Sequence, residues 1–268
     1  MPASRSANRN AKAAARPRNY WPVVLIGLAV FIAVVIAALP ASTISHFLPR
    51  SVHAEDFSGS IWHGSAGKIN VNGRDGGALE WWLHPAAFLR LAVAADLHWV
   101  KIGFVVDGAA RIDPHGVTAR AVKGGGPIED LHDLGVAAGW RGTADINFSE
   151  LKTDFAQPLA AVGDVKVSNL ASGQIAGGAD LGGYVLRFDE GAVDSDGNLT
   201  ARLVDTGGPL DVHTLIRYSA KERTGLLSGT LSERPEASAA LRSQIDGLSQ
   251  LRGRDAQGRI PVDLEFRF

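Results

Sequence analysis

The stretch FSGSIWHGSAGKINVNGRDGGALEWWLHP, Phe57–Pro85, alternates apolar and polar residues on both sides of a glycine-rich centre. In an extended chain, Leu79, Trp81 and Leu83 fall on one face and the residues between them fall on the other. Residues 72–77, NGRDGG, tolerate the positive φ angles that a hairpin turn requires. The stretch therefore predicts two paired antiparallel strands whose tryptophans fill a core.

The same alternation continues along the rest of the chain and predicts a mainly β fold. Segment Leu91–Val106 is expected to form one long strand. Segment Ile260–Phe268 is expected to form a closing strand with one buried face, made of Ile260, Val262, Leu264, Phe266 and Phe268. Between them, short β-type runs are separated by segments rich in turn-forming residues. These turn segments are 113–116, 194–198, 205–209 and 220–225.

Helical signals are few. Segment 233–253 is the best candidate, because Pro235 suits a first helical turn, leucines and an isoleucine follow at helical spacing, and Gly253 suits the end. Segments 126–135 and 149–161 are each expected to hold two or three turns. The few short helices would decorate an antiparallel sheet.

An internal repeat predicts how that sheet is organised. TARAVKGGGPIE (118–129) and TARLVDTGGPLD (200–211) are identical at seven of twelve positions, including a shared Gly-Gly-Pro. We expect two related β modules stacked into one continuous sheet, at roughly 55–135 and 136–268. Chance similarity between glycine-rich turns is the alternative explanation.

The N-terminal region predicts a membrane anchor. Residues 1–19 contain five basic residues and no acidic residue, and no charged residue lies between Arg18 and Arg50. The apolar run Trp21–Leu39 would extend about 28 Å as a helix, close to the ~30 Å of a bilayer core. We expect a cytoplasmic tail at 1–19, a transmembrane helix at 20–42 and an external domain at 43–268.

A cleavable signal peptide is the alternative to this anchor. Its apolar region would be shorter, about 7–15 residues, and it would end in a site of small residues. Here Pro40 interrupts the most obvious small-residue site, which favours an anchor that is not cleaved.

Composition excludes several classes of function. Outside the N-terminal 42 residues, 28 acidic groups exceed 22 basic ones, which disfavours nucleic-acid binding. The chain has no cysteine, so disulfides, thiolate metal sites and cysteine nucleophiles are excluded.

No motif in the chain predicts a catalytic, cofactor-binding or metal-binding residue. HGSAG has His63 where the sharp turn of a serine nucleophile, here Ser65, requires glycine. DSDGN, with Asp194 and Asp196, lacks the later glutamate of a calcium loop, so a hairpin turn explains it better. KGGGP (123–127) lacks the Gly-Lys-Ser/Thr of a phosphate loop, and the eight histidines have no zinc-site spacing. We expect a protein that is not an enzyme and needs no cofactor.

The tryptophans could form either a core or a ligand platform. Trp62, Trp81, Trp99 and Trp140 occupy strand-like positions, where aromatic residues usually stabilise a sheet. Trp82 lies on the opposite face from Trp81. If both faces of this strand were buried, the sheet would be covered on both sides.

An ordered set of segments resembles the type II secretion system protein N family. The segments are SGSIWHGSAG, GALEWWLHPAAFL, PLAAVGDVKVSNLASG, ADLGGYVLRF, DTGGPLDVHTLIRY and GLLSGTLSERPEASAALRSQIDGLSQLRGRDAQGRIPVDL. Together they cover most of residues 45–268. The second tryptophan of LEWWLHP, Trp82, and His84 depart from the small or polar residues more usual there.

The resemblance implies an accessory structural component of the type II protein secretion apparatus. It implies one pass through the bacterial inner membrane, a cytoplasmic N-terminus and a periplasmic β domain that binds other secretion components, either the inner-membrane platform or the outer-membrane secretin. The family offers no catalytic residue. The Gly-x-Ile-Trp pattern is also similar to AsmA-like periplasmic proteins, so lipid binding or lipid handling is the alternative, and an apolar concave face would favour it.

Overall fold

The computed structural model describes residues 21–134, 136 and 138–267. It divides into two compact units, Met1–Leu39 and Pro40–Phe268. In the first unit, α1 (Trp21–Ala37) is an apolar helix without a charged residue. No helix in the described part of the chain is both long and apolar enough to span a membrane.

The membrane anchor expected over 20–42 therefore remains a prediction. The described helix ends at Ala37, and the segment from Ala41 onward belongs to the second unit. The expected cytoplasmic tail, 1–19, lies outside the described residues.

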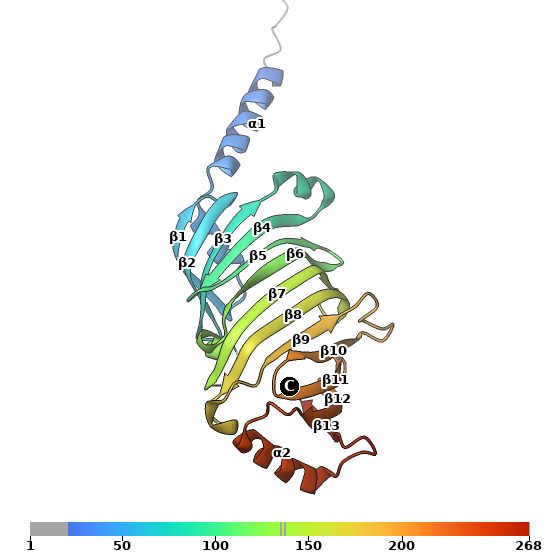
Figure 1. Cartoon of the computed structure of the whole chain (residues 1–268). Helices are drawn as coiled ribbons and strands as arrows, with labels where there is room; N and C mark the ends of the chain where they lie inside the picture. Colours follow the sequence, from blue (N-terminus) through green and yellow to red (C-terminus); the bar gives the residue numbers. More distant parts are fainter. Residues whose placement is uncertain (1–20, 135, 137, 268) are drawn as a thin grey trace, which may run out of the picture. The chain divides into compact units, whose positions relative to one another are not determined.

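The second unit is built on a single antiparallel sheet in which all thirteen strands formed by the described residues follow one another in chain order (Figure 1). The strands are β1 (Val52–Gly59), β2 (His63–Val71), β3 (Arg74–Leu83), β4 (Val93–Lys101), β5 (Phe104–Asp113), β6 (Gly116–Pro127), β7 (Trp140–Thr153), β8 (Pro158–Ser172), β9 (Gly183–Phe188), β10 (Asn198–Gly207), β11 (Leu210–Ser219), β12 (Thr224–Glu233) and β13 (Ile260–Arg267).

The described residues of this unit also form five helices, which lie between strands or before the first one. They are η1 (Ala41–Phe47), η2 (Pro85–Arg90), η3 (Glu129–Leu134), η4 (Ala176–Gly178) and α2 (Ala239–Arg252), of which only α2 is an α-helix.

One row of directly paired residues, here called the inner row, crosses the whole sheet. Residues that face each other across neighbouring strands point to the same side, so the row defines one face. Its members are Phe57, Ala66, Leu79, Trp99, Val106, Gly124, Ile146, Val165, Leu186, Leu203, Thr214, Gly229 and Val262. The row contains no charged residue, and its one hydroxyl, Thr214 Oγ1, is buried without a hydrogen bond.

The adjacent row, here called the outer row, points to the opposite side. Its members are Ser58, Ser65, Glu80, His98, Asp107, Lys123, Asn147, Asp164, Arg187, Arg202, Leu215, Ser228 and Asp263. Every member except Leu215 is polar or charged. The sheet is therefore apolar on one face and hydrophilic on the other.

Short helices cover parts of the inner face and form three small cores. In the first, Ala41 and Ile44 of η1 pack on Trp81. In the second, Ile128 packs on Phe104, and in the third, Ile245 of α2 is packed in one cluster with Ile260 and Leu181. Most of the inner row between these cores is only half-buried, so the helices leave much of the apolar face without a second layer.

The predicted alternation in β3 is confirmed. Trp81 is 6% exposed and packs with Leu79 and Leu83, whereas Trp82 on the other face is 39% exposed. The outer face is therefore open to solvent at β3, and the sheet is not covered on both sides there. The indole N–H of Trp81 donates to the carbonyl of Ile61 at 2.9 Å, which satisfies its one polar atom.

The single long strand expected over Leu91–Val106 is wrong. The structure has two strands, β4 and β5, joined by a tight turn at Ile102 and Gly103, which have φ angles of 42° and 81°. Both turn residues adopt the left-handed conformation that a two-residue hairpin requires, although isoleucine is an unfavourable residue for it. Because isoleucine is typical of strands, the sequence pattern does not predict a turn at this position.

The helix expected over 233–253 begins later than its pattern indicated. Strand β12 continues through Glu233, and α2 starts after Ser238, whose hydroxyl accepts a hydrogen bond from the N–H of Leu241 at 3.2 Å. Gly253, with φ of 75°, follows the helix as predicted.

The two shorter helical expectations have different outcomes. Segment 126–135 holds only the 3₁₀ helix η3 among its described residues. Segment 149–161 is not helical: it forms the end of β7 and the start of β8. The turn between them is stabilised by Asp154, whose carboxylate accepts the N–H groups of Ala156 and Gln157.

The sheet continues without a break across the boundary expected near 135/136, since β6 and β7 pair along their length. The repeated segments both begin as strands, but they continue differently. Gly126 and Pro127 remain in β6, paired with β7, whereas Gly208 and Pro209 form the turn between β10 and β11. The structure is thus one sheet, and the two modules remain a proposal about its origin.

Trp81→Ala should lower the free energy of unfolding of the Pro40–Phe268 unit by about 3–5 kcal/mol, because it leaves a cavity between η1 and the sheet. Denaturant unfolding followed by far-UV circular dichroism measures this loss. The matched control is Trp82→Ala, on the open outer face, which should cost about 1 kcal/mol or less. Equal losses for the two variants would contradict the assignment of Trp81 to the core.

Candidate functional site

A cavity of about 250 Å³ lies between η1 and the inner face of the first four strands. Ile44 and Leu48 contribute from η1 and the residue after it. The rest of the lining comes from β1 to β4 and consists of Val52, Ala54, Phe57, Ala66, Ile69, Leu79, Trp81, Leu83, Ala95 and Leu97. Every lining residue is apolar, so the cavity suits an apolar ligand or an apolar side chain of a partner.

Polar groups close to this cavity have partners within the chain. The indole N–H of Trp99, next along the inner row, donates to the carbonyl of Gly76 at 2.6 Å. Lys101, whose side chain is 1% exposed, donates to the carbonyl of Asp75 at the start of β3. These contacts hold the start of β3 against β4. The N–H donors of Trp99 and Lys101 therefore bond to backbone carbonyls and are not left unpaired on the apolar face.

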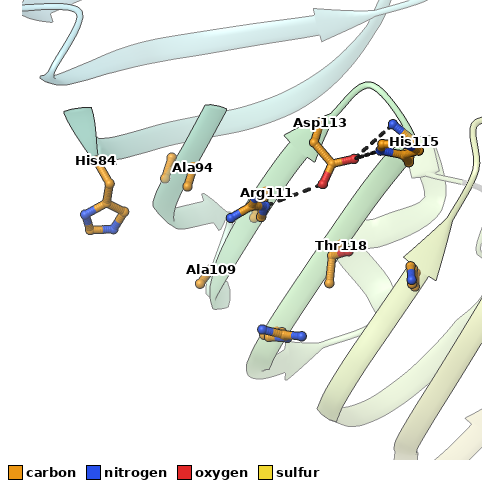
Figure 2. A pocket seen from close by; sticks show the side chains of 12 residues that line it. His84, Ala94, Ala109, Arg111, Asp113, His115 and Thr118 are labelled. Atoms are coloured by element: carbon orange, nitrogen blue, oxygen red, sulfur yellow. Dashed lines mark hydrogen bonds and ion pairs between the residues drawn. The ribbon is translucent and has the colours of Figure 1, made fainter. Parts of the chain in front are cut away.

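A second hollow, of about 580 Å³, lies at the ends of β4 to β7 and includes outer-face side chains. Figure 2 shows Arg111 and His115 directed toward Asp113, with Thr118 on the neighbouring strand. Arg120 and Lys152 complete a predominantly basic lining.

The charges of this hollow are exposed and partly paired. The N–H of His115 donates to the Asp113 carboxylate at 2.9 Å and, together with the Arg111 guanidinium at 3.5 Å, lowers the pKa of Asp113. Arg120 is bonded to Glu150 at 3.2 Å. An open basic hollow of this kind can receive acidic side chains of a partner, but it presents no nucleophile beside a base.

Asp205, Asp211 and His213 lie close enough together to suggest a metal site. However, the guanidinium of Arg234 contacts Asp205 at 2.6 Å and Asp211 at 2.9 Å. The carboxylate of Asp205 also accepts the N–H groups of Gly207 and Val212. The guanidinium of Arg234 already bonds to both carboxylates, which favours a structural clasp around the β10–β11 turn over a metal site.

The residues considered in the sequence motifs do not assemble into a site. Ser65 lies within 3.1 Å of the hydroxyl of Ser58, and His63 stacks on Trp82. The side-chain and backbone N–H groups of Asn198 bond to the Asp194 carboxylate and lower its pKa, as expected for a hairpin turn.

The cavity beneath η1 was missed in the sequence. Ile44 and Leu48 follow Pro40 in a segment that reads as a connector, and nothing local reveals that it folds back onto β1–β4. The one available signal is the presence of the apolar residues Ile44 and Leu48, because a solvated linker does not need apolar residues.

The first and last strands leave the sheet with free edges among the described residues. On β13, Leu264 is 49% exposed at the apolar face, and Asp263 and Glu265 on the opposite face are exposed. Charged residues on an edge strand discourage nonspecific pairing.

The fold defines an antiparallel, mainly β protein whose apolar face is only partly covered by helices. The family model for type II secretion system (T2SS), protein N, matches residues 50–263, and the chain belongs to this family. It is therefore a component of the type II secretion machinery. No curated protein and no solved structure matches the chain significantly.

Asp205→Asn should lower the free energy of unfolding at pH 7 by about 1–3 kcal/mol, because it removes a charge-assisted bond from a carboxyl that is 5% exposed. Burial of Asp205 opposes its ionisation, but hydrogen bonds from Arg234 and Val212 outweigh burial and lower its pKa. The stabilisation is present above the unfolded-state pKa of about 4 and is lost as pH falls through the folded-state pKa.

Denaturant unfolding at a series of pH values from neutral to acid tests this. The variant should lose less stability than the wild type on acidification below about pH 4. Asp113→Asn, at a 30% exposed carboxyl, is the control and should change stability less. Added zinc or calcium should raise the melting temperature of neither protein, and a metal-dependent rise would contradict the clasp.

Proposed function

We propose that this chain is an accessory structural component of the type II secretion apparatus that tethers a periplasmic sheet to the inner membrane. The observation that carries the proposal is the family match over residues 50–263. The single-sheet fold supports it, because a face and edges, rather than a catalytic cleft, are its prominent surfaces.

The proposed orientation has the N-terminus in the cytoplasm and the sheet in the periplasm. The basic residues before Trp21 and the uncharged run up to Arg50 support this orientation. Strand β13 is the proposed contact for another secretion component, since a peptide or strand can add to an exposed sheet edge.

Lipid handling is the second candidate function. The observation that favours it is the inner row, which crosses all thirteen strands without a charged residue. A scaffold needs a specific surface but does not need an uncharged row of this extent, only part of which is covered by helices.

The proposed topology predicts the activity of reporter fusions. A reporter that folds only in the periplasm should be active when fused after Phe268 and inactive when fused after Asn19. The reverse pattern would reject the orientation. A mature chain that begins near residue 42 would instead show that the apolar segment is a cleaved signal peptide.

The scaffold proposal predicts that deletion of the gene impairs export of folded proteins across the outer membrane, and that the wild-type chain restores it. Leu264→Asp, at the exposed end of β13, should restore export poorly although the protein accumulates normally, because a charge there opposes apolar contact with a partner. The matched control is Glu265→Lys on the opposite face, which should restore export. Unimpaired export in the deletion strain would contradict the proposal.

A further inference from the structure

The cavity beneath η1 is an open hollow at one end of the inner face. Ile44 and Leu48 lie over it, and Phe57, Leu79 and Leu97 form part of its floor. Its volume of about 250 Å³ exceeds the roughly 150 Å³ of a dry apolar cavity that can admit benzene. An apolar group the width of a hydrocarbon chain can therefore enter.

The chemistry of the lining decides which class of ligand can enter. None of the lining side chains carries an unused donor or acceptor, because the one polar atom among them, Nε1 of Trp81, is bonded to Ile61. Strands β2, β3 and β4 of the floor bond their backbone groups to strands on both sides, and in the described part of the chain β1 alone among the floor strands has a free edge. An extended peptide that lay across the floor, rather than pairing with the edge of β1, would therefore bury its own N–H and C=O groups without partners, which is costly. A hydrocarbon chain has no such groups.

The cavity is continuous with the inner row, because Phe57, Ala66 and Leu79 belong to both. Beyond them the row continues through Trp99 and Val106, which pack against the second core around Phe104 and Ile128 and are partly exposed. A chain longer than the cavity would therefore extend along the part of these apolar side chains that the second core leaves uncovered. Hydrocarbon gains free energy along that path in proportion to the area it buries.

The sequence next to the cavity indicates the source of such a chain. Helix α1 ends at Ala37, seven residues before Ile44, and its described leucine, isoleucine, valine and phenylalanine side chains are exposed. An uncharged helix with this surface is suited to a lipid environment. The cavity is therefore close in the chain to a segment that would bring it near membrane lipid.

We propose that this cavity binds one acyl chain of a membrane phospholipid, with the chain continuing along the inner row. The proposal rests on lipid handling, the second candidate function, and assigns it a site and a ligand class. It does not depend on the contact proposed for β13, so one can fail without the other.

Photo-crosslinking of the full-length chain in living cells tests the proposal. Cells are grown with a fatty acid that carries a photoreactive diazirine and that they incorporate into phospholipid. After irradiation, the protein is purified and its modified peptides are identified by mass spectrometry. We expect adducts of intact phospholipid mass on peptides from residues 44–57 and 79–97, besides any on the apolar helix.

Two variants and one control make the result specific to the cavity. Ile44→Asn places an amide in the lining and should reduce these adducts roughly fivefold or more, because a buried amide without a partner opposes an apolar ligand. Ala54→Phe fills the cavity with apolar volume and should reduce them similarly. Phe47→Asn is the control: Phe47 is 81% exposed, lies on the same η1 and does not line the cavity, so the adducts should persist.

Each other outcome rejects the proposal. Adducts confined to the apolar helix would show that the cavity does not hold lipid. Equal yields from wild type and from both folded variants, checked by their melting curves, would show that the lipid lies elsewhere. Adducts of free fatty acid mass would reject the phospholipid source. Loss of secretion in the deletion strain without cavity adducts would leave the scaffold role standing and reject the lipid site.

Discussion

The register between neighbouring strands is the constraint on which the rest of this structure depends. A shift of one residue at any strand pair would exchange the apolar and polar faces beyond that point. Across β5 and β6, for example, Val106 pairs with Gly124 on the inner face while Asp107 pairs with Lys123 on the outer face. All three cores, the cavity beneath η1 and the hydrophilic outer face require the same alignment in twelve successive pairings.

Bulges preserve this alignment where strand lengths differ. Between Asp107 and Ala109 of β5, strand β6 has one extra residue, and Ala121 there adopts a φ of 50°. The added residue keeps Ala110 paired with Ala119 on the apolar face. Without it, Ala110 would face Arg120, and apolar residues of β5 would meet polar residues of β6 beyond this point. The bulge therefore corrects register as well as increasing local twist.

The sequence predicts the faces of single strands but not their continuation across the sheet. Alternation in 79–83 was sufficient to place Trp81 inside and Trp82 outside, because both statements concern one strand. The inner row depends on which residue of one strand opposes which residue of the next, and this is decided by turns and bulges such as Ile102–Gly103 and Ala121. Neither an isoleucine in a tight turn nor an alanine at positive φ carries a recognisable local signal.

The candidate site was unpredictable for a related reason. The cavity forms only when η1, which precedes the sheet in the chain, returns over β1–β4, and tertiary packing of this kind has no periodic pattern in the sequence. The clasp of Arg234 on Asp205 similarly joins the end of β12 to the β10–β11 turn. The sequence alone allows the prediction that catalytic and metal-binding motifs are lacking. Contacts between separate elements can be identified only in the folded chain.

The strict chain order of the strands also affects how the protein is made. Each strand pairs with the strand synthesised just before it, so the sheet can grow by one hairpin at a time without waiting for distant residues. If the chain leaves the membrane from its N-terminal side, η1 and the first strands can form their core before β13 emerges. During this growth the newest strand always has an open edge. Helix α2, which ends before Gly253, lies in the chain between β12 and the final strand, β13. The strands can thus be added in chain order, and the open edge finally passes to β13, whose exposed Asp263 and Glu265 discourage nonspecific pairing.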